Sequence, residues 1–340
     1  MDKNAIFEKM LLEYVEREQI FGSLQIAQHD KVIYKKHFGY ANLENKTPID
    51  DDTVFRFYSM SKQFTAIAIM QLYDKGLLDV NDSVCNILPY CPLPEKVKLI
   101  HLLQHSSGLS ESTKEAATDE SGKVSYERLC AHLAKQPLAF EPGTAWDYLN
   151  TNYILPSLIV EHISGEKFSD YLKKNIFDPL GMSTAKCEEE GVNIPNLAVG
   201  YDLVDGVVCP AGRHGLLGFS LGAAYITGKM SDADCLHKAV REGKLLSGKA
   251  WDMIHTKADV SNFGFGCMIL HENGIKFYQN NGGHLGFRTL HRYIPDHDFD
   301  VILLSNSGFG SARNDIGTMI FNCYLGGSSG EQILMDKGLT

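Results

Sequence analysis

The chain has 340 residues, which is enough for two domains or for one large domain with an insertion. Its hydrophobic content of 44% and charged content of 22% are those of an ordinary globular protein, and they exclude a disordered chain, a collagen and a small disulfide scaffold. With 42 acidic against 32 basic residues the net charge is −10, and no basic run offers the face that nucleic acids need. We therefore expect a small-molecule partner and no nucleic acid.

The N-terminal segment and the cysteines indicate the cellular compartment of the protein. The first twenty residues carry charges throughout and lack the apolar core of a secretory signal, and no stretch approaches the roughly 18 apolar residues of a membrane span. These features predict a cytoplasmic protein with no membrane partner. The 8 cysteines are irregularly spaced and include no Cys-x-x-Cys pair, so we expect free thiols, mostly buried. No cofactor is expected, and the oligomeric state stays open.

The N-terminal quarter alternates between helical and strand patterns. Apolar residues at helical spacing predict an amphipathic surface helix at the start of the chain: Ile6, Met10, Leu11, Tyr14 and Val15. Residues 21–57 alternate as strands do, with a hairpin turn at His29-Asp30 and a second break at Gly39. From Ser59 the apolar spacing becomes helical and ends at Gly76, a natural residue to follow a helix.

The remaining chain divides into a helical part and a strand-rich part. From about 80 to 215, helical segments are broken by Pro and Gly, whereas from about 216 four strand-like runs with tight turns precede a final helical segment at 315–325. The simplest arrangement is a sheet-and-helix domain of residues 1–80 and 216–340, with a helical domain of residues 81–215 inserted. We expect an α/β (α+β) fold with an antiparallel sheet flanked by helices, and an active site in the cleft between the domains.

A Ser-x-x-Lys pattern stands where the strand-like run becomes a helix. In Ser59-Met60-Ser61-Lys62 the first and last side chains share one helix face, so the lysine amine can reach the serine hydroxyl and activate it. The helix N-terminus also offers unpaired N–H groups to an oxyanion. The pattern alone has little weight, because it recurs at Ser164 and Ser183, and because Tyr-x-Asn, the second element, begins at Tyr40, Tyr148 and Tyr278.

Order and context separate these copies. The run GYANLENKTPIDDDTVFRFYSMSKQFT (39–65) resembles the nucleophile region of the serine β-lactamase-like superfamily, which includes class C β-lactamases, DD-peptidases and β-lactamase-like esterases. Further segments are similar to that superfamily's other markers, in the same order: HLLQHSSGL (101–109), EPGTAWDYLNTNYILPSLIVEHISG (141–165), FDPLGM (177–182) and VILLSNS (301–307). The resemblance covers nearly the whole chain and implies a β-lactamase/transpeptidase-like fold.

The resemblance also implies roles for particular residues. Ser59 would attack a carbonyl carbon, while Lys62 and Tyr148 would jointly accept its proton and later deliver one to the leaving group. Asn150 would donate a hydrogen bond to a substrate carbonyl. The backbone N–H groups of Ser59 and Gly283 would form the oxyanion hole, and water would then hydrolyse the acyl-enzyme.

The third element departs from the superfamily pattern. The usual Lys or His, any residue, then Gly is matched here by Asn280-Asn281-Gly282, followed by Gly283 and His284. An amide at position 280 cannot offer a full charge to a substrate carboxylate, which favours a neutral ester or amide over β-lactam or D-Ala-D-Ala carboxylates. His284 would compensate, either by facing the cleft or through a shifted register, or it would be a strand histidine that is hydrogen-bonded elsewhere.

Three further patterns compete with this interpretation. Gly218-Phe219-Ser220-Leu221-Gly222 matches the nucleophile elbow of α/β-hydrolases, with Asp252 and His284 following in order, although the parallel βαβ alternation of that fold is missing. His101-x-x-x-His105 has zinc-ligand spacing without an obvious third ligand, so a structural helix end is favoured. Arg288 and His291 would bind an acidic group or occupy the strand surface.

These observations predict a serine hydrolase that forms an acyl-enzyme on Ser59 and acts on a small ester, amide or peptide. One alternative is a DD-carboxypeptidase or β-lactamase, which the missing leader and Asn280 disfavour. The other is a catalytically weak member of the superfamily that uses its cleft as a binding or regulatory module. Asn280 supports that interpretation, whereas Ser59, Lys62 and Tyr148 oppose it. No metal ligand is expected.

Overall fold

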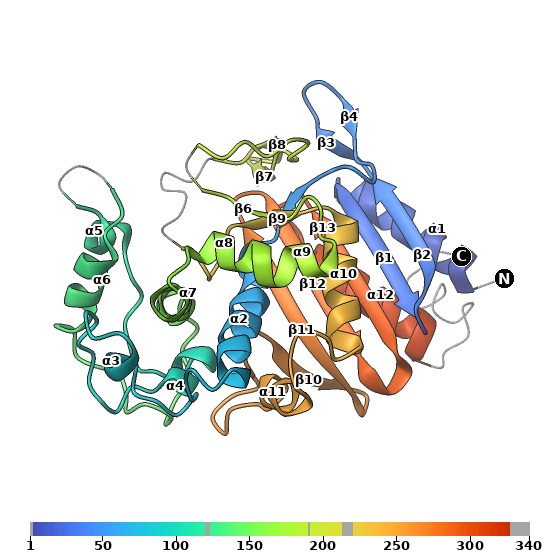
Figure 1. Ribbon diagram of the computed structural model, residues 1–340. Coiled ribbons are helices and arrows are strands. Elements are labelled where there is room, and N and C mark those ends of the chain that lie inside the picture. Colours follow the sequence, from blue (N-terminus) through green and yellow to red (C-terminus); the bar gives the residue numbers. More distant parts are fainter. Residues whose placement is uncertain (1–2, 120–122, 190, 213–219, 327–340) are drawn as a thin grey trace.

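An antiparallel sheet with the strand order β10-β11-β12-β13-β1-β2 forms the centre of the protein (Figure 1). The computed structural model describes residues 3–119, 123–189, 191–212 and 220–326. The strands of this sheet are β1 (Gly22–Gln28), β2 (Lys31–Phe38), β10 (Met268–Glu272), β11 (Ile275–His284), β12 (Phe287–Ile294) and β13 (Phe299–Ser305). The pairing of β1 with β13 therefore joins the N-terminal and C-terminal parts of the chain in one sheet.

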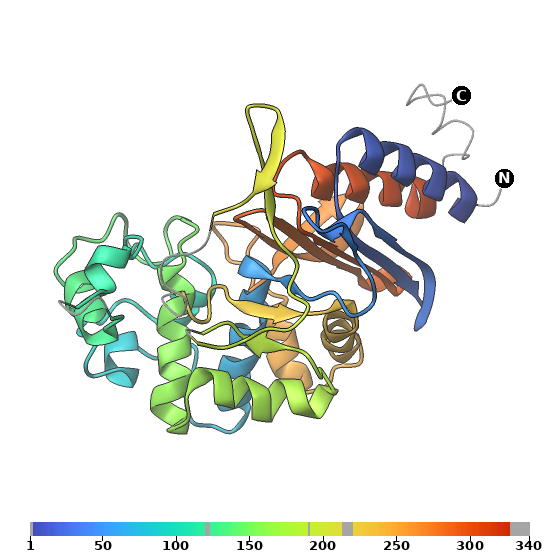
Figure 2. The same cartoon turned by 90° about the horizontal axis from the view of Figure 1, so that it is seen from above.

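Helices cover both faces of this sheet. On one face α1 (Lys3–Arg17) and α12 (Ala312–Ile320) lie side by side (Figure 2). The other face is covered by α2 (Lys62–Asp74), α10 (Met230–Arg241) and α11 (Gly248–Ile254). Alternate residues of β13 point to opposite faces, so Val301 and Leu303 join the core under α1 and α12, while Ile302 and Leu304 join the other core. Burial on both faces explains the continuous apolar run of this strand.

A second, mostly helical region lies beyond α2 (Figure 1). It contains α3 (Val84–Ile87), α4 (Leu99–Leu103), α5 (Lys114–Ala117), α6 (Tyr126–Leu133), α7 (Thr151–Ser164), α8 (Phe168–Leu172), the π-helical turn η2 (Lys173–Phe177) and α9 (Asp178–Leu180). The remaining strands are short and form small sheets outside the central one: β3 (Tyr40–Asn42), β4 (Thr47–Pro48), β5 (Phe55–Arg56), β6 (Lys186–Cys187), β7 (Tyr201–Val204), β8 (Val207–Pro210) and β9 (Ile226–Gly228). None of the helices in the described ranges is both long and apolar enough to cross a membrane.

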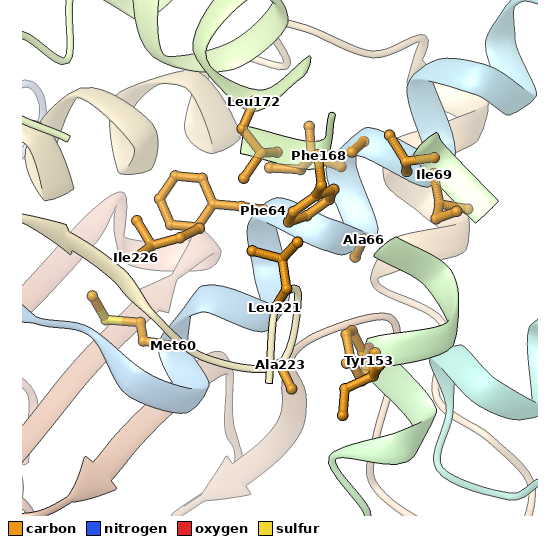
Figure 3. Close-up of a cluster of buried hydrophobic side chains, with 14 of the residues drawn as sticks. Met60, Phe64, Ala66, Ile69, Tyr153, Phe168, Leu172, Leu221, Ala223 and Ile226 are labelled. Atoms are coloured by element: carbon orange, nitrogen blue, oxygen red, sulfur yellow. The ribbon is translucent and has the colours of Figure 1, made fainter. Parts of the chain in front are cut away.

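Helix α2 is the element that joins the two regions. Every residue from Lys62 to Leu72 is buried, which is the pattern of a helix enclosed on all sides. Figure 3 shows Phe64 and Ile69 of this helix among side chains from other elements, including Phe168 of α8 and Ile226 of β9. Because α2 is packed on all sides, its N-terminal end is held in a fixed position relative to both regions.

Most of the expected elements are confirmed. The first helix buries the predicted apolar stripe, and the hairpin turns at His29 and Asp30, both with positive φ. Gly39 and Gly76 adopt φ of +74° and +69°, as a break and a helix end require. All the cysteines are free and most are buried. The expectation of a helical segment throughout 80–215 missed the β7–β8 hairpin, whose strands are short and largely exposed and so lack a strong apolar alternation.

Candidate active site

Ser59 lies on a sharp turn between a strand and a helix. The chain leaves β5, passes through Tyr58 with φ of +47°, and enters the 3₁₀ turn η1 (Tyr58–Ser61) that precedes α2. A non-glycine residue in this left-handed region is strained, and such strain is held only where the surroundings are tightly packed. The helix was expected to begin at Ser59, whereas the α-helix itself begins at Lys62. The 3₁₀ turn leaves the Ser59 hydroxyl at the amino end of α2.

Lys62 is a fully buried lysine whose hydrogen bonds are all made within the chain. Its Nζ donates to Ser59 Oγ at 3.1 Å, to Asn150 Oδ1 at 2.9 Å and to the Ala223 carbonyl at 2.9 Å. As an ammonium group Nζ donates to all three oxygens, and as the neutral amine it donates to two of them and accepts the Ser59 hydroxyl proton on its lone pair. The side chain is only 1% exposed. Lys62 is therefore held in one position against the Ser59 hydroxyl.

Tyr148 presents the face of its ring to Lys62. The ring centroid lies 4.8 Å from Lys62 Nζ, within the range of a cation–π contact. Within the described ranges no hydrogen bond joins the phenol oxygen to Ser59 or Lys62, and the residue is 38% exposed. The structure thus brings the three predicted side chains together, with the lysine between the serine and the tyrosine ring.

The ring of His105 stacks against the ring of Tyr148, a contact that the sequence interpretation missed. The two rings stack with centroids 4.4 Å apart. His105 Nδ1 accepts from the Leu149 backbone N–H at 3.2 Å and lies 3.3 Å from the Asn152 amide nitrogen, so this nitrogen is an acceptor and the ring is neutral. Burial, together with the neighbouring charge of Lys62, lowers the pKa of His105 well below its usual value. The only sequence signal was its place within HLLQHSSGL.

Asn150 stands at the start of α7 with its amide oxygen turned to Lys62. Its backbone N–H donates to the Glu111 carboxylate at 2.8 Å, which fixes the residue at this helix end. With the oxygen occupied by Lys62, the amide NH₂ is the group that remains to donate a hydrogen bond. This orientation agrees with the donor role that the resemblance implies.

Strand β11 packs against the η1 turn that carries Ser59. A Cβ atom on Gly282 would collide with the Phe57 carbonyl oxygen, so only glycine allows the strand to lie this close to η1. Thr289 of the adjacent strand secures the contact by donating its Oγ1 hydroxyl to that carbonyl at 3.0 Å. Asn280 is buried, and its amide nitrogen donates to the Gly266 carbonyl. The amide at position 280 is therefore already engaged with the backbone.

These elements enclose a cavity of about 390 Å³. Its lining combines aromatic and apolar side chains with amides and two arginines: Ser59, Lys62, Trp146, Tyr148, Phe263, Gly266, Met268, Gln279, Asn280, Asn281, Gly283, Arg288 and Arg313. Of the predicted site residues in the described chain, Asn150 and His284 are outside this lining. His284 is exposed, and its ring stands edge-on to Tyr58 with centroids 5.6 Å apart. Arg313, on α12, was not anticipated.

The competing patterns have other surroundings. Ser164 Oγ donates to the Val160 carbonyl of its own helix, and His101 Nδ1 accepts the Lys98 backbone N–H at a helix start. Gly218 and Phe219 lie outside the described residues. The central sheet pairs only antiparallel strands across the described ranges, which excludes an α/β-hydrolase elbow. His291 is only 2% exposed, so the surface role expected for it is wrong.

The comparisons with known proteins agree with this geometry. Residues 7–319 match the family described as Beta-lactamase. The chain belongs to the beta-lactamase family. As a member of this family it is a serine hydrolase with a β-lactamase/transpeptidase-like fold.

Particular relatives show how far the likeness extends. A putative penicillin-binding protein, PbpX, of Bacillus subtilis is 29% identical over 308 residues, which are 91% of this chain and 76% of that protein. A D-aminopeptidase of Gluconobacter oxydans is 30% identical over 185 residues, 53% of this chain and 35% of that protein. The octameric penicillin-binding protein homologue from Pyrococcus abyssi superimposes with a TM-score of 0.81 at 27% identity, covering 97% of this chain and 79% of that one.

Proposed function

We propose that this hydrolase forms an acyl-enzyme on Ser59 and acts on a small ester or amide. The observation that carries the proposal is the buried Lys62 Nζ, 3.1 Å from Ser59 Oγ, at a cavity of about 390 Å³. A serine hydroxyl is a weak nucleophile until a base removes its proton, and this amine is within reach to do so. The cavity volume suits a small molecule.

The reaction follows from the positions of these groups. Ser59 Oγ bonds to the substrate carbonyl carbon while its proton passes to the neutral Lys62 amine, with the Tyr148 phenol sharing the proton transfer, and the carbonyl π electrons move onto oxygen. The backbone N–H groups of Ser59 and Gly283, both on the cavity wall, stabilise that oxyanion. The tetrahedral intermediate then collapses and its bond to the leaving group breaks. The leaving group takes the proton that came from Ser59. Water then attacks the acyl carbon and releases the acid and free Ser59.

The lining favours a neutral substrate next to strand β11. Asn280 has no charge and already donates to the Gly266 carbonyl, so it offers no cation to a carboxylate. Trp146 and Phe263 supply an aromatic wall that fits an acyl chain or an aromatic side chain. The similarity to a D-aminopeptidase supports an amide of a D-amino acid as one substrate class to test.

A second candidate, a DD-carboxypeptidase or β-lactamase, has one observation in its favour. Arg288 and Arg313 line the same cavity and bring two guanidinium groups to its wall. A guanidinium can bind a carboxylate with two parallel hydrogen bonds, which would compensate for the amide at position 280. The similarity to penicillin-binding proteins supports this candidate as well.

We also infer that the cavity marks the cleft between the two predicted domains. Trp146 and Tyr148 come from the segment 81–215, whereas Ser59, Gly283 and Arg313 come from 1–80 and 216–340. Contribution from both parts supports the predicted division and the proposal that the reaction takes place where the parts meet.

A serine-directed probe tests the proposal directly. Wild-type protein and Ser59→Ala are treated with a fluorophosphonate or a labelled penicillin, and the adduct is located by mass spectrometry. We expect one adduct, on Ser59, which the variant loses. Ser164→Ala is the matched control and keeps the adduct, because Ser164 Oγ is bound to its own helix. An adduct elsewhere, or none, overturns the acyl-enzyme proposal, and absence of any adduct favours a binding module.

A substrate panel then separates the two candidates. Short acyl esters and D-amino-acid amides are compared with nitrocefin and a D-Ala-D-Ala peptide. Arg288→Gln serves as the charge variant. If the substrate is neutral, the variant keeps wild-type kcat/KM on esters and amides. If the substrate is a carboxylate, we expect kcat/KM to fall about tenfold or more with the loss of a charge-assisted hydrogen bond.

A further inference from the structure

A second polar cluster is buried in the core, away from the cavity of Ser59. It consists of His237 on α10, His291 on β12 and Asp300 on β13, with exposed fractions of 1%, 2% and 4%. Helix α10 packs against β13, so one histidine comes from the helix and the other two side chains come from the sheet beneath it. None of the three lines the Ser59 cavity in the described part of the chain.

The polar atoms of this cluster converge without forming hydrogen bonds. Both nitrogens of His237, both nitrogens of His291 and Oδ1 of Asp300 have no hydrogen-bond partner among the described residues. His291 Nε2 lies 3.4 Å from Asp300 Oδ1, and His237 Nδ1 lies 3.8 Å from the same oxygen. Buried nitrogen and oxygen atoms are nearly always paired, so an unpaired group of this size demands an explanation.

The distances between these nitrogen and oxygen atoms match the distances between neighbouring ligand atoms around a bound metal ion. Zinc binds imidazole nitrogen and carboxylate oxygen at about 2.0–2.1 Å, so neighbouring ligand atoms of a tetrahedral site lie about 3.3–3.4 Å apart. One atom from each of the three residues can be chosen so that all lie within 4.8 Å of one another. The two imidazole rings are nearly parallel, with centroids 3.1 Å apart, much closer than the usual 4.5 Å or more for stacked rings. Imidazoles bound to one tetrahedral ion through their in-plane nitrogens have centroids farther apart than this, so the two rings must turn apart when the ion binds.

The chemistry of the donors narrows the choice of ion. Two imidazoles and one carboxylate suit zinc and similar transition ions, whereas magnesium and calcium prefer an all-oxygen shell. Both imidazole rings are almost fully buried, so the ion would be enclosed by protein. His291 also borders a cavity of about 20 Å³, room for one water molecule.

We propose that His237, His291 and Asp300 bind one divalent ion of the zinc type, with water as the fourth ligand. The ion would tie α10 to strands β12 and β13. His291 pairs directly with Asn280 across the sheet, and Asn280 lines the Ser59 cavity. The ion is therefore placed to stabilise the sheet one strand away from the catalytic cavity, and it takes no part in the attack on substrate.

Metal titration of chelator-stripped full-length protein tests the site. Zn²⁺ is added under calorimetry, and Co²⁺ is added while visible absorption is recorded. We expect one equivalent of each metal to bind, and the intense visible bands of four-coordinate Co²⁺ to appear. X-ray absorption of the zinc-loaded wild type is expected to show two imidazole ligands. No stoichiometric binding, or a shell with fewer than two imidazoles, overturns the proposal.

Variants locate the site within the chain. Asp300→Asn keeps the size of the side chain and removes its charge, and His237→Gln removes one imidazole. Each is expected to weaken zinc binding at least 100-fold. His271→Gln is the matched control on an exposed position of β10 and keeps wild-type affinity. Equal affinity in all variants overturns the assignment to these residues. Should a variant fail to fold, the wild-type absorption experiments still decide, because they need no substitution.

Discussion

Two buried polar centres of this protein differ in how their hydrogen bonds are satisfied. At Lys62 the amine nitrogen has three hydrogen-bond partners that the chain itself supplies. At His237, His291 and Asp300 the imidazole nitrogens and Oδ1 of the carboxylate come close together, and none of them has a hydrogen-bond partner among the described residues. A buried polar group costs free energy unless it is paired, so the first centre is complete in the chain and the second requires something added.

The two centres also differ in access. Lys62 and Ser59 border a cavity of about 390 Å³, whereas the histidine cluster adjoins space for little more than one water molecule. A satisfied lysine beside an open cavity can act on a substrate and return to its starting state. An enclosed, unsatisfied set of ligands is suited to holding an ion. These differences support the proposals that the first centre acts on substrate and that the second stabilises the fold.

The largest effect is expected from substitutions at Lys62 and at Tyr148. Lys62→Ala or Tyr148→Phe should lower the rate of acylation by about 100-fold or more, in line with loss of a general base. Stopped-flow measurements with a chromogenic ester report that rate. Lys167→Ala, in the Ser164 copy of the motif, is the control and should match the wild type because its side chain is exposed. Near-normal acylation in both Lys62 and Tyr148 variants would remove those residues from the mechanism.

Zinc binding at His237, His291 and Asp300 should stabilise the fold. At a free zinc concentration 100 times Kd, we expect the unfolding free energy of stripped wild-type protein to rise by about 2.7 kcal/mol. Chemical denaturation with and without zinc measures the change. Asp300→Asn should gain little at the same zinc concentration, since one ligand charge is lost. An equal gain in both proteins would place the ion elsewhere.

A change of one glycine should separate strand β11 from the turn that carries Ser59. The added methyl of Gly282→Ala meets the Phe57 carbonyl, so we expect a loss of about 1–3 kcal/mol in unfolding free energy and a slower acylation of Ser59. Gly248→Ala is the control, because its Cβ would have open space at the start of α11, and it should not destabilise the protein. Unchanged stability and acylation in Gly282→Ala would show that the close approach is not required.

The smallest effect concerns the histidine that supports Tyr148. Because the pKa of folded His105 is lowered, the unfolded state binds more protons below about pH 6.5, and the unfolding free energy falls as pH falls. One such group contributes up to about 1.4 kcal/mol per pH unit. His105→Asn keeps an acceptor for the Leu149 N–H and cannot titrate, so its curve between pH 6.5 and 5 should be flatter. Parallel curves for the two proteins would contradict the assignment.

Local patterns anticipated the elements that carry strong periodicity. The first helix, the His29-Asp30 hairpin and the four C-terminal strands follow from apolar spacing and turn residues in the sequence. The β7–β8 hairpin was missed because its strands are exposed, so they carry no alternating apolar signal. The position of Ser59 was anticipated, but the 3₁₀ turn before α2 was not, since a strained φ at Tyr58 depends on packing around it.

The candidate active site also combines residues that the sequence predicted with residues that it did not. Ser59 and Lys62 are three residues apart, so their proximity follows from helix geometry alone. The contribution of Tyr148 and Asn150 followed from a resemblance. Arg313 and His105 were missed, because an arginine on α12 and a histidine under Tyr148 have no local signal that connects them to Ser59.

The sequence by itself determined the class of fold, the serine–lysine pair and the unusual amide at position 280, because these depend on spacing along a helix or on residue identity. Only the tertiary structure decided that Arg288 and Arg313 share the cavity with Ser59, and that His237, His291 and Asp300 meet in the core. These contacts depend on how α10 and α12 pack on the sheet. Contacts between elements that are distant in the chain produce no periodic pattern in the sequence.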